Sequence, residues 1–418
     1  MSPRSVVTHA GPPAPAARTG PGIRVTPPAL RDLDWIRGAL QTAVALEHAT
    51  MPLYSAAMYS LEVQNYPSYN TIRSVLMEEM VHMAIAANML AALGGSPDIK
   101  GLRPRYPAPG GGLPGGVMPG LTPVLARLSA RQLDDFLRIE APARLLSERE
   151  RRSAYPTIGH FYDALRQAVT ANADRVRRAV RAGGPANQVG GNLGYLTFAP
   201  DDPADPVERF LHGIDIITHQ GEGEHERTIE AGGTYQHEGS HYARFAELRH
   251  RRRYRAPDPL RPLTRDTEAD FFRGEEIPWP VVINTLAVPA DGYAAVLAED
   301  PDGPAARKEL DAFDAAYTAM MTALDRAWNG PAETWWPSLG AAVERMNDMR
   351  VLSCFNVMRQ PVPEAVVERL EVLYPREYKL LADRTDLGRP VFYGPRFQNN
   401  AAQNNAAQNN AAQNNAAQ

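Results

Sequence analysis

Apolar residues recur at helical spacing through a series of long segments of this chain. The pattern predicts a first helix over residues 30–62 and a second over residues 71–93, which Asn70 can cap. Pro52 lies inside the first segment, and its missing N–H predicts a kink just after Glu47.

The same periodicity predicts further helices over residues 129–142, 157–180, 206–230 and 240–255. Residues 100–123 are instead crowded with Gly and Pro and predict a long irregular excursion. In a compact domain such an excursion is more often functional or covering than idle. We therefore expect it to cover part of the helical domain.

Composition and periodicity divide the chain into five parts. Helical spacing continues near the C-terminus without sustained strand alternation, and the final residues repeat Ala-Ala-Gln-Asn-Asn, which matches neither helix nor strand. We expect a disordered leader (1–28), a helical domain with the candidate ligands (29–254), a Pro-rich junction (255–280), a helical accessory domain (281–397) and a disordered tail (398–418).

Length and charge narrow the class of protein. The chain has 418 residues, of which 44% are apolar, so it can bury one large core or two smaller ones. Its net charge of −4 offers no general attraction to nucleic acid or to an anionic membrane. No run reaches the roughly 18 consecutive apolar residues of a membrane helix. A single cysteine, Cys354, fits a reducing compartment, so we expect a cytoplasmic protein.

Candidate ligands lie inside four of the predicted helices. Residues i and i+3 of a helix share one face, so a Glu-x-x-His pair can direct a carboxylate and an imidazole at the same metal ions. Two such pairs with two single Glu residues are the ligand set of ferritin-like di-iron bundles. We therefore predict an all-α fold, a ferritin-like four-helix bundle with extra helices and a C-terminal helical extension. The candidates are Glu47, Glu79 with His82, Glu140, and Glu222 with His225.

Two of the candidate carboxylates have an alternative interpretation. Glu47 lies in an apolar run, where an unpaired buried charge would be costly unless it bound a metal or another cation. Glu140 could instead be an ordinary carboxylate at a helix end. Glu78 points about 100° away from its neighbour Glu79, so we expect it to be exposed to solvent.

The imidazole ligands are less certain from the sequence. His225 lies in a stretch crowded with other Glu and His residues, and both His241 and His160 are further candidates. A hydrogen-bonded structural histidine is an equally good interpretation of these two. Tyr54 lies two turns after Glu47 on the same face, where it lines a substrate pocket or packs in the core.

The donor types favour iron. Carboxylates with a few imidazoles suit iron or manganese, whereas closed zinc sites favour thiolates, which this chain lacks apart from Cys354. We expect two iron ions, with manganese as the alternative. Two Fe(II) ions supply two electrons to O2, so the metal centre itself would be the catalytic group.

Several segments resemble one family. The segments LEHATMPLYSAAMYS, LMEEMVHMAIAANMLAALGG, RIEAP, TIGHFY, HQGEGE and SHYARFAEL resemble the ferritin-like domain of the iminophenyl-pyruvate dimer synthase family. That family includes violacein, rebeccamycin and staurosporine pathway enzymes, which couple two imines of aromatic 2-oxo acids. The resemblance covers roughly residues 30–248. The segments FDAAYTAMMTALDRAW and AAVERMNDMRVLSCFNVM also look like the helical extension of stand-alone members.

The resemblance carries ligand roles to individual residues. It implies that Glu47, Glu79, His82, Glu140 and Glu222 bind the metals. The family often has Glu at the position of His160, whereas the His of SHYARF recurs and the position of His225 is frequently not His. The sixth ligand is therefore His225 or His241.

These observations lead to one preferred function and two alternatives. We expect a di-iron oxidase or oxygenase of specialised metabolism that uses O2 and a small amino-acid-derived imine or amine, with oxidative coupling as one form of the reaction. The alternatives are an iron-handling protein without substrate chemistry and an inactive partner subunit. A homo-oligomer is compatible with each of them.

Overall fold

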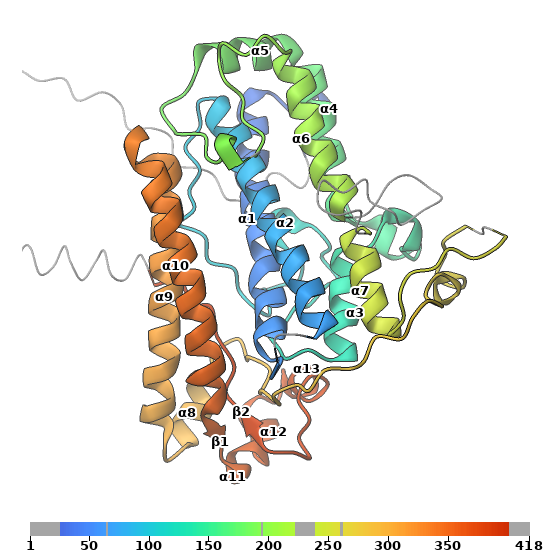
Figure 1. The fold of residues 1–418 in the computed structure, drawn as a ribbon, viewed down its shortest axis with the longest axis vertical. Coiled ribbons are helices and arrows are strands. Elements are labelled where there is room, and N and C mark those ends of the chain that lie inside the picture. The colour runs from blue at the N-terminus through green and yellow to red at the C-terminus, as the bar shows by residue number, and fades with distance from the viewer. Residues whose placement is uncertain (1–25, 64–65, 194, 222–238, 260–261, 401–418) are drawn as a thin grey trace, which may run out of the picture.

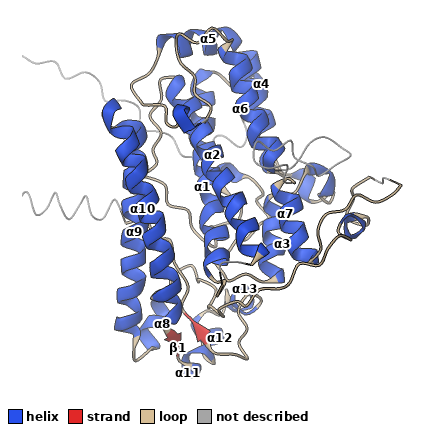
Figure 2. Cartoon of the chain, in the orientation of Figure 1, coloured by secondary structure: helices blue, strands red, loops and turns tan. Residues whose placement is uncertain are grey.

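A computed structural model of the chain describes residues 26–63, 66–193, 195–221, 239–259 and 262–400. Helices dominate these residues, and the one ladder of named strands pairs β1 (Pro361–Val362) antiparallel with β2 (Val391–Phe392) (Figure 2). The predicted all-α class is confirmed. Short 3₁₀ turns occupy Pro28–Leu30, Pro114–Gly116, Ala143–Leu145, Glu150–Arg152, Gly191–Leu193, Glu268–Phe271, Ala332–Thr334 and Val357–Arg359.

Two long helices, α1 (Leu33–Tyr59) and α2 (Pro67–Ala92), pack along each other at the centre of the molecule (Figure 1). The carboxylate of Asp32 caps α1 by accepting the N–H of Trp35. The prediction that Asn70 caps the second helix is wrong. That helix begins one turn earlier at Pro67, because proline in the first helical position lacks only an N–H that the helix does not use.

The other side of the bundle is built from two pairs of shorter helices. In Figure 1, α4 (Ile158–Ala171) and α6 (Pro206–Gly221) pack together above α3 (Ala130–Ile139) and α7 (His241–His250), which also pack together. The third and fourth positions of the bundle are therefore each divided between two helices. As predicted, Ser129 caps α3, where its hydroxyl accepts the N–H of Gln132.

The predicted helix over residues 157–180 is divided at Asn172. There α4 ends and α5 (Ala173–Ala182) begins, because Asn172 has φ −111° and ψ 23°, outside the helical range. Its side-chain amide donates to the carbonyls of Arg31 and Ala168, at 2.7 and 2.9 Å. These hydrogen bonds hold the break, which periodicity does not reveal.

The C-terminal part packs on the bundle rather than apart from it. The hairpin of α9 (Gly303–Asn329) and α10 (Trp335–Phe355) runs beside α1 (Figure 1), and its apolar residues belong to the same buried core. Gln398, Asn399 and Asn400 pack against α9 and the loop after α2 through hydrogen bonds. The remaining short helices are α8 (Ala294–Glu299), α11 (Glu364–Val367), α12 (Leu370–Leu373) and α13 (Tyr378–Ala382).

One described helix, α2, is long and apolar enough to cross a membrane. Inside the protein, however, 83% of its most apolar window is buried, which is the usual state of a core helix.

Candidate dimetal site

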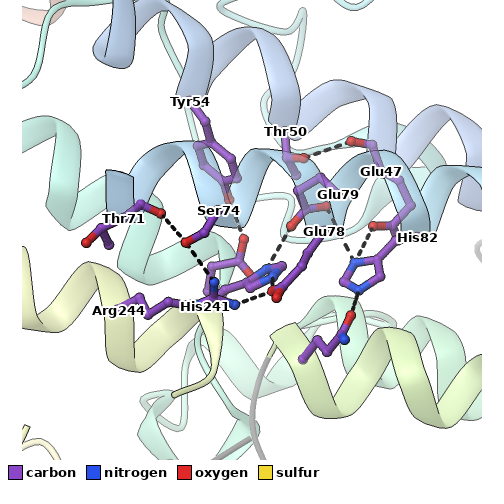
Figure 3. Close-up of polar contacts among 12 residues, drawn as sticks. Glu47, Thr50, Tyr54, Thr71, Ser74, Glu78, Glu79, His82, His241 and Arg244 are labelled. Carbon is purple, nitrogen blue, oxygen red and sulfur yellow. Dashed lines mark hydrogen bonds and ion pairs between the residues drawn. The ribbon is translucent and has the colours of Figure 1, made fainter. Parts of the chain in front are cut away.

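Buried carboxylates and imidazoles meet near the middle of α1 and α2 (Figure 3). They form two groups, and within each group the ligand atoms lie within 4.8 Å of one another. Group A consists of Glu47, Glu79 and His82, and group B consists of Glu79, Glu140 and His241. Glu79 belongs to both groups and lies between two candidate cation positions.

The helices supply these residues in two ways. Glu47 and the Glu-x-x-His pair lie within the long helices α1 and α2, where helical periodicity alone sets their common face. In contrast, Glu140 is the C-cap of α3 and His241 is the first residue of α7, after the N-cap Ser240. The divided helices therefore deliver their ligands from helix ends.

In group A, His82 directs one ring nitrogen at the carboxylates and the other away from them. Its Nδ1 lies 3.6 Å from Oε2 of Glu47 and 3.8 Å from Oε2 of Glu79. Its Nε2 lies 2.7 Å from the side-chain oxygen of Gln220, on α6. A histidine that binds metal with one nitrogen and donates the other N–H to a nearby acceptor has this arrangement.

Group B repeats the arrangement with a different acceptor. Nδ1 of His241 lies 2.9 Å from Oε1 of Glu79 and 3.5 Å from Oε2 of Glu140, yet it makes no hydrogen bond with any described residue. Its Nε2 lies 2.9 Å from Oε2 of Glu78. The rings of His82 and His241 are stacked, with centroids 5.4 Å apart.

The prediction that Glu78 is exposed is wrong, because its side chain is buried against α7. It accepts hydrogen bonds from His241 and from the Arg244 guanidinium, which also donates to the hydroxyl of Ser74 at 3.0 Å (Figure 3). Although burial raises the pKa of Glu78, the hydrogen bond and charge of His241, together with Arg244, lower it below its usual value. Glu78 is therefore a buried, ionised partner of the group B imidazole.

Two buried tyrosines hold the outer carboxylates. The hydroxyl of Tyr162, on α4, donates to Oε1 of Glu47 at 2.5 Å, and that of Tyr54, on α1, donates to Oε1 of Glu140. Tyr54 also packs edge-on against Phe136, so it belongs to the core and touches the site as well. The sequence-based prediction included neither Tyr162 nor Gln220.

The charges of the site are unbalanced. Within the described residues, the ion pairs of Glu47, Glu79 and Glu140 involve only histidines, and no lysine or arginine neutralises them. Burial, together with the charge of Glu79, raises the pKa of Glu47 to about 7. Burial lowers the pKa of His82, but hydrogen bonds and charges of Glu47 and Glu79 outweigh it and raise the value to about 9.

This donor set fits a pair of divalent cations. Three buried carboxylates, whose ion-pair partners among the described residues are all imidazoles, carry negative charge that two cations would neutralise. Nδ1 of His241 is buried among carboxylates and makes no well-aligned hydrogen bond with a described residue, so it is the kind of atom that a metal ion satisfies. Oxygen donors with one imidazole for each ion suit iron or manganese better than zinc.

Of the three other predicted site residues, only His160 is described by the structure. Glu222 and His225 lie outside the described residues; α6 ends at Gly221, where an added Cβ would lie 3.5 Å from Oε2 of Glu140. His160 is half-buried, and its Nδ1 contacts the N-cap hydroxyl of Thr157 at 2.9 Å. His160 therefore lies at the N-terminus of α4 and in neither group.

His241 lies in group B, and one feature of the sequence not used above also indicates it as a ligand. Glu238 precedes it by three residues, so His241 also ends a Glu-x-x-His segment. Glu238 is outside the described residues.

Comparison with protein families finds a match over the helical part that holds the two groups. Residues 40–250, just over half of the chain, match the model of the Ferritin-like family. The chain belongs to the Ferritin-like family. A solved structure of a ferritin like protein from Caulobacter vibrioides is 22% identical, covers 77% of this chain and 94% of its own, and has a TM-score of 0.49. Comparison with curated proteins gave no match.

Proposed function

We propose that this Ferritin-like chain binds two iron ions through groups A and B and uses them to activate O2 toward an organic substrate. The single observation that carries the proposal is the pair of buried ligand groups joined by Glu79. Such sharing brings two cations close together, as carboxylate-bridged di-iron chemistry requires.

The roles of the residues follow from their contacts. Bound iron would supply the electrons for O2 reduction. Glu79 would contact both ions, Glu47 and His82 one of them, and Glu140 and His241 the other. Tyr162 and Tyr54 fix the outer carboxylates by donating to one oxygen of each, which leaves the other oxygen directed at the imidazole. All of these ligand side chains are buried, which limits the access of bulk water to them.

The substrate class rests on the sequence resemblance. The segments that resemble iminophenyl-pyruvate dimer synthases support an amino-acid-derived imine or amine as substrate, with oxidative coupling as one form of the reaction. The extension by α9 and α10 supports an enzyme over a storage protein, because storage cages consist of little more than the four-helix bundle.

The first experiment measures iron. We expect about two Fe(II) per chain after anaerobic loading of the wild type, since two ligand groups are present, and strongly reduced loading in Glu79→Ala. Glu208→Ala, which removes an exposed carboxylate from α6, is the matched control and should load like the wild type. Equal, negligible iron in all three proteins would refute the proposed metal site.

A second experiment separates oxidation of a substrate from iron storage. The Fe(II) protein is mixed with O2 in the presence and absence of aromatic and aliphatic amino acids, their 2-oxo acids and the derived imines. Faster O2 consumption with an organic compound, and an oxidised product, would support the enzyme. Oxidation of many irons per chain without any organic compound would instead show iron storage.

A further inference from the structure

The described donors of groups A and B match except at one position. Each group has one outer carboxylate that accepts a tyrosine hydroxyl, one imidazole that faces the carboxylates through Nδ1, and the shared Glu79. The difference is the acceptor at Nε2. His82 meets the neutral amide of Gln220 at 2.7 Å, whereas His241 meets the carboxylate of Glu78 at 2.9 Å.

We infer that the two metal positions are unequal and that group B, through the Glu78–His241 contact, binds its ion more tightly than group A. The inference rests on the proposed dimetal site and adds an order of filling to it. Glu78 contacts the imidazole and no ligand atom of the metal groups other than that ring, so its role is to position and polarise His241.

The physical reason is the strength of the hydrogen bond at Nε2. A carboxylate accepts the ring N–H more strongly than an amide oxygen does, and it leaves more electron density on Nδ1. Partners of this kind change metal affinity by about 10-fold to 100-fold when they are removed. The described environment therefore favours group B by a factor in this range.

Arg244 does not cancel this difference. Its guanidinium donates to the same Oε2 of Glu78 that faces His241, and to Ser74 on α2 (Figure 3). A neighbouring cation weakens the field of Glu78 at a distance. The direct hydrogen bond to the ring remains, and Arg244 holds the carboxylate in place to accept it.

Co(II) is the probe for the test, because its visible absorption reports the geometry of each occupied site. His241→Ala leaves only group A complete, and His82→Ala leaves only group B complete. We expect the His82→Ala protein to bind Co(II) about 10-fold to 100-fold more tightly than the His241→Ala protein.

The decisive variant is Glu78→Gln, which keeps the shape and an acceptor oxygen but removes the charge. In the His82→Ala background it should weaken Co(II) binding about 10-fold to 100-fold, and in the His241→Ala background it should change nothing. Gln220→Glu makes the opposite change, because it gives His82 a charged acceptor. It should tighten Co(II) binding in the His241→Ala background. Circular dichroism of each metal-free protein checks that the helices remain.

Two results would overturn the inference while leaving the dimetal site intact. One is equal affinity of the two single-histidine proteins. The other is an equal loss in both backgrounds on Glu78→Gln. If the single-histidine proteins bind no Co(II), the inference is tested by stepwise Co(II) titration of the wild type and of Glu78→Gln. The variant should weaken only the binding step of higher affinity. A wild type that binds no metal would instead refute the proposed function.

Discussion

Replacing Tyr162 by phenylalanine removes one hydrogen bond from the site without opening a large cavity. The hydroxyl of Tyr162 donates to Oε1 of Glu47 at 2.5 Å, and both side chains are buried. A hydrogen bond to a charged group contributes about 1.5–3 kcal/mol to stability, and one between neutral groups about 1 kcal/mol. The pKa of Glu47 is raised to about 7, so the charged form prevails at pH 8 and the neutral form at pH 5.5.

These values translate into a change of melting temperature. An unfolding entropy of roughly 2.1 cal/mol/K per residue gives about 0.9 kcal/mol/K for a chain of 418 residues that unfolds in one transition. Tyr162→Phe should therefore lower the Tm of the metal-free protein by about 2–3 °C at pH 8 and by about 1 °C at pH 5.5. Calorimetry of chelator-treated protein at the two pH values measures the difference.

Tyr317→Phe is the matched control. Tyr317 is equally buried, and its hydroxyl contacts Nε2 of His48 at 3.0 Å. Burial lowers the pKa of His48 to about 4, so this acceptor is neutral at both pH values. The control should lose about 1 °C at each pH. The charged contact with Glu47 would be refuted if Tyr162→Phe lowered the Tm by the same amount at both pH values and by no more than Tyr317→Phe does.

Three further predictions concern stability. The metal-free protein should become less stable as pH rises from 6 to 9. The pKa values of Glu47 and His82 in the folded state are raised to about 7 and 9, so the folded state releases these protons at higher pH than the unfolded chain does. Stability is therefore lost as the pH rises through this range. Added Fe(II) or Mn(II) should reverse the trend in thermal melts. Arg384→Ala should destabilise the protein by up to about 3–5 kcal/mol in urea titrations, because it removes the buried cation of Asp135 on α3 and leaves only the more exposed guanidinium of Arg131, 3.6 Å away, whereas Arg345→Ala on the exposed face of α10 should change little. Ser129→Ala should cost about 1 kcal/mol through loss of the α3 cap, and a change below the error of the titration would contradict the capping hydrogen bond.

Helical periodicity predicts which residues of group A share a helix face. Glu47, Glu79 and His82 lie within long uninterrupted helices, where spacing alone determines which side chains share a face. The cap at Ser129 and the all-α class follow from equally local rules. These features need no knowledge of which helix is next to which.

The remaining features depend on tertiary packing. Periodicity predicts that Glu78 faces solvent, because it points about 100° from Glu79, but α7 covers that side of α2. Gln220 and Tyr162 come from α6 and α4, and nothing in their local sequence shows that they point at His82 and Glu47. The choice between His225 and His241 also depended on where the divided fourth helix resumes. His241 lies in group B, and His225 lies outside the described residues.

The late position of α7 in the chain affects the order in which the two groups can assemble during folding. Group A lies within a single hairpin of neighbouring helices, whereas group B needs His241, 163 residues after Glu78. Contacts between residues close in sequence generally form before distant ones, because less chain entropy is lost on closing the loop. As the chain leaves the ribosome, Glu47, Glu79 and His82 can therefore meet while the second half of the site is still unsynthesised. The position that we infer to bind more weakly is the one that assembles first, so a newly made chain should capture stray metal poorly until the helix bearing His241 has docked.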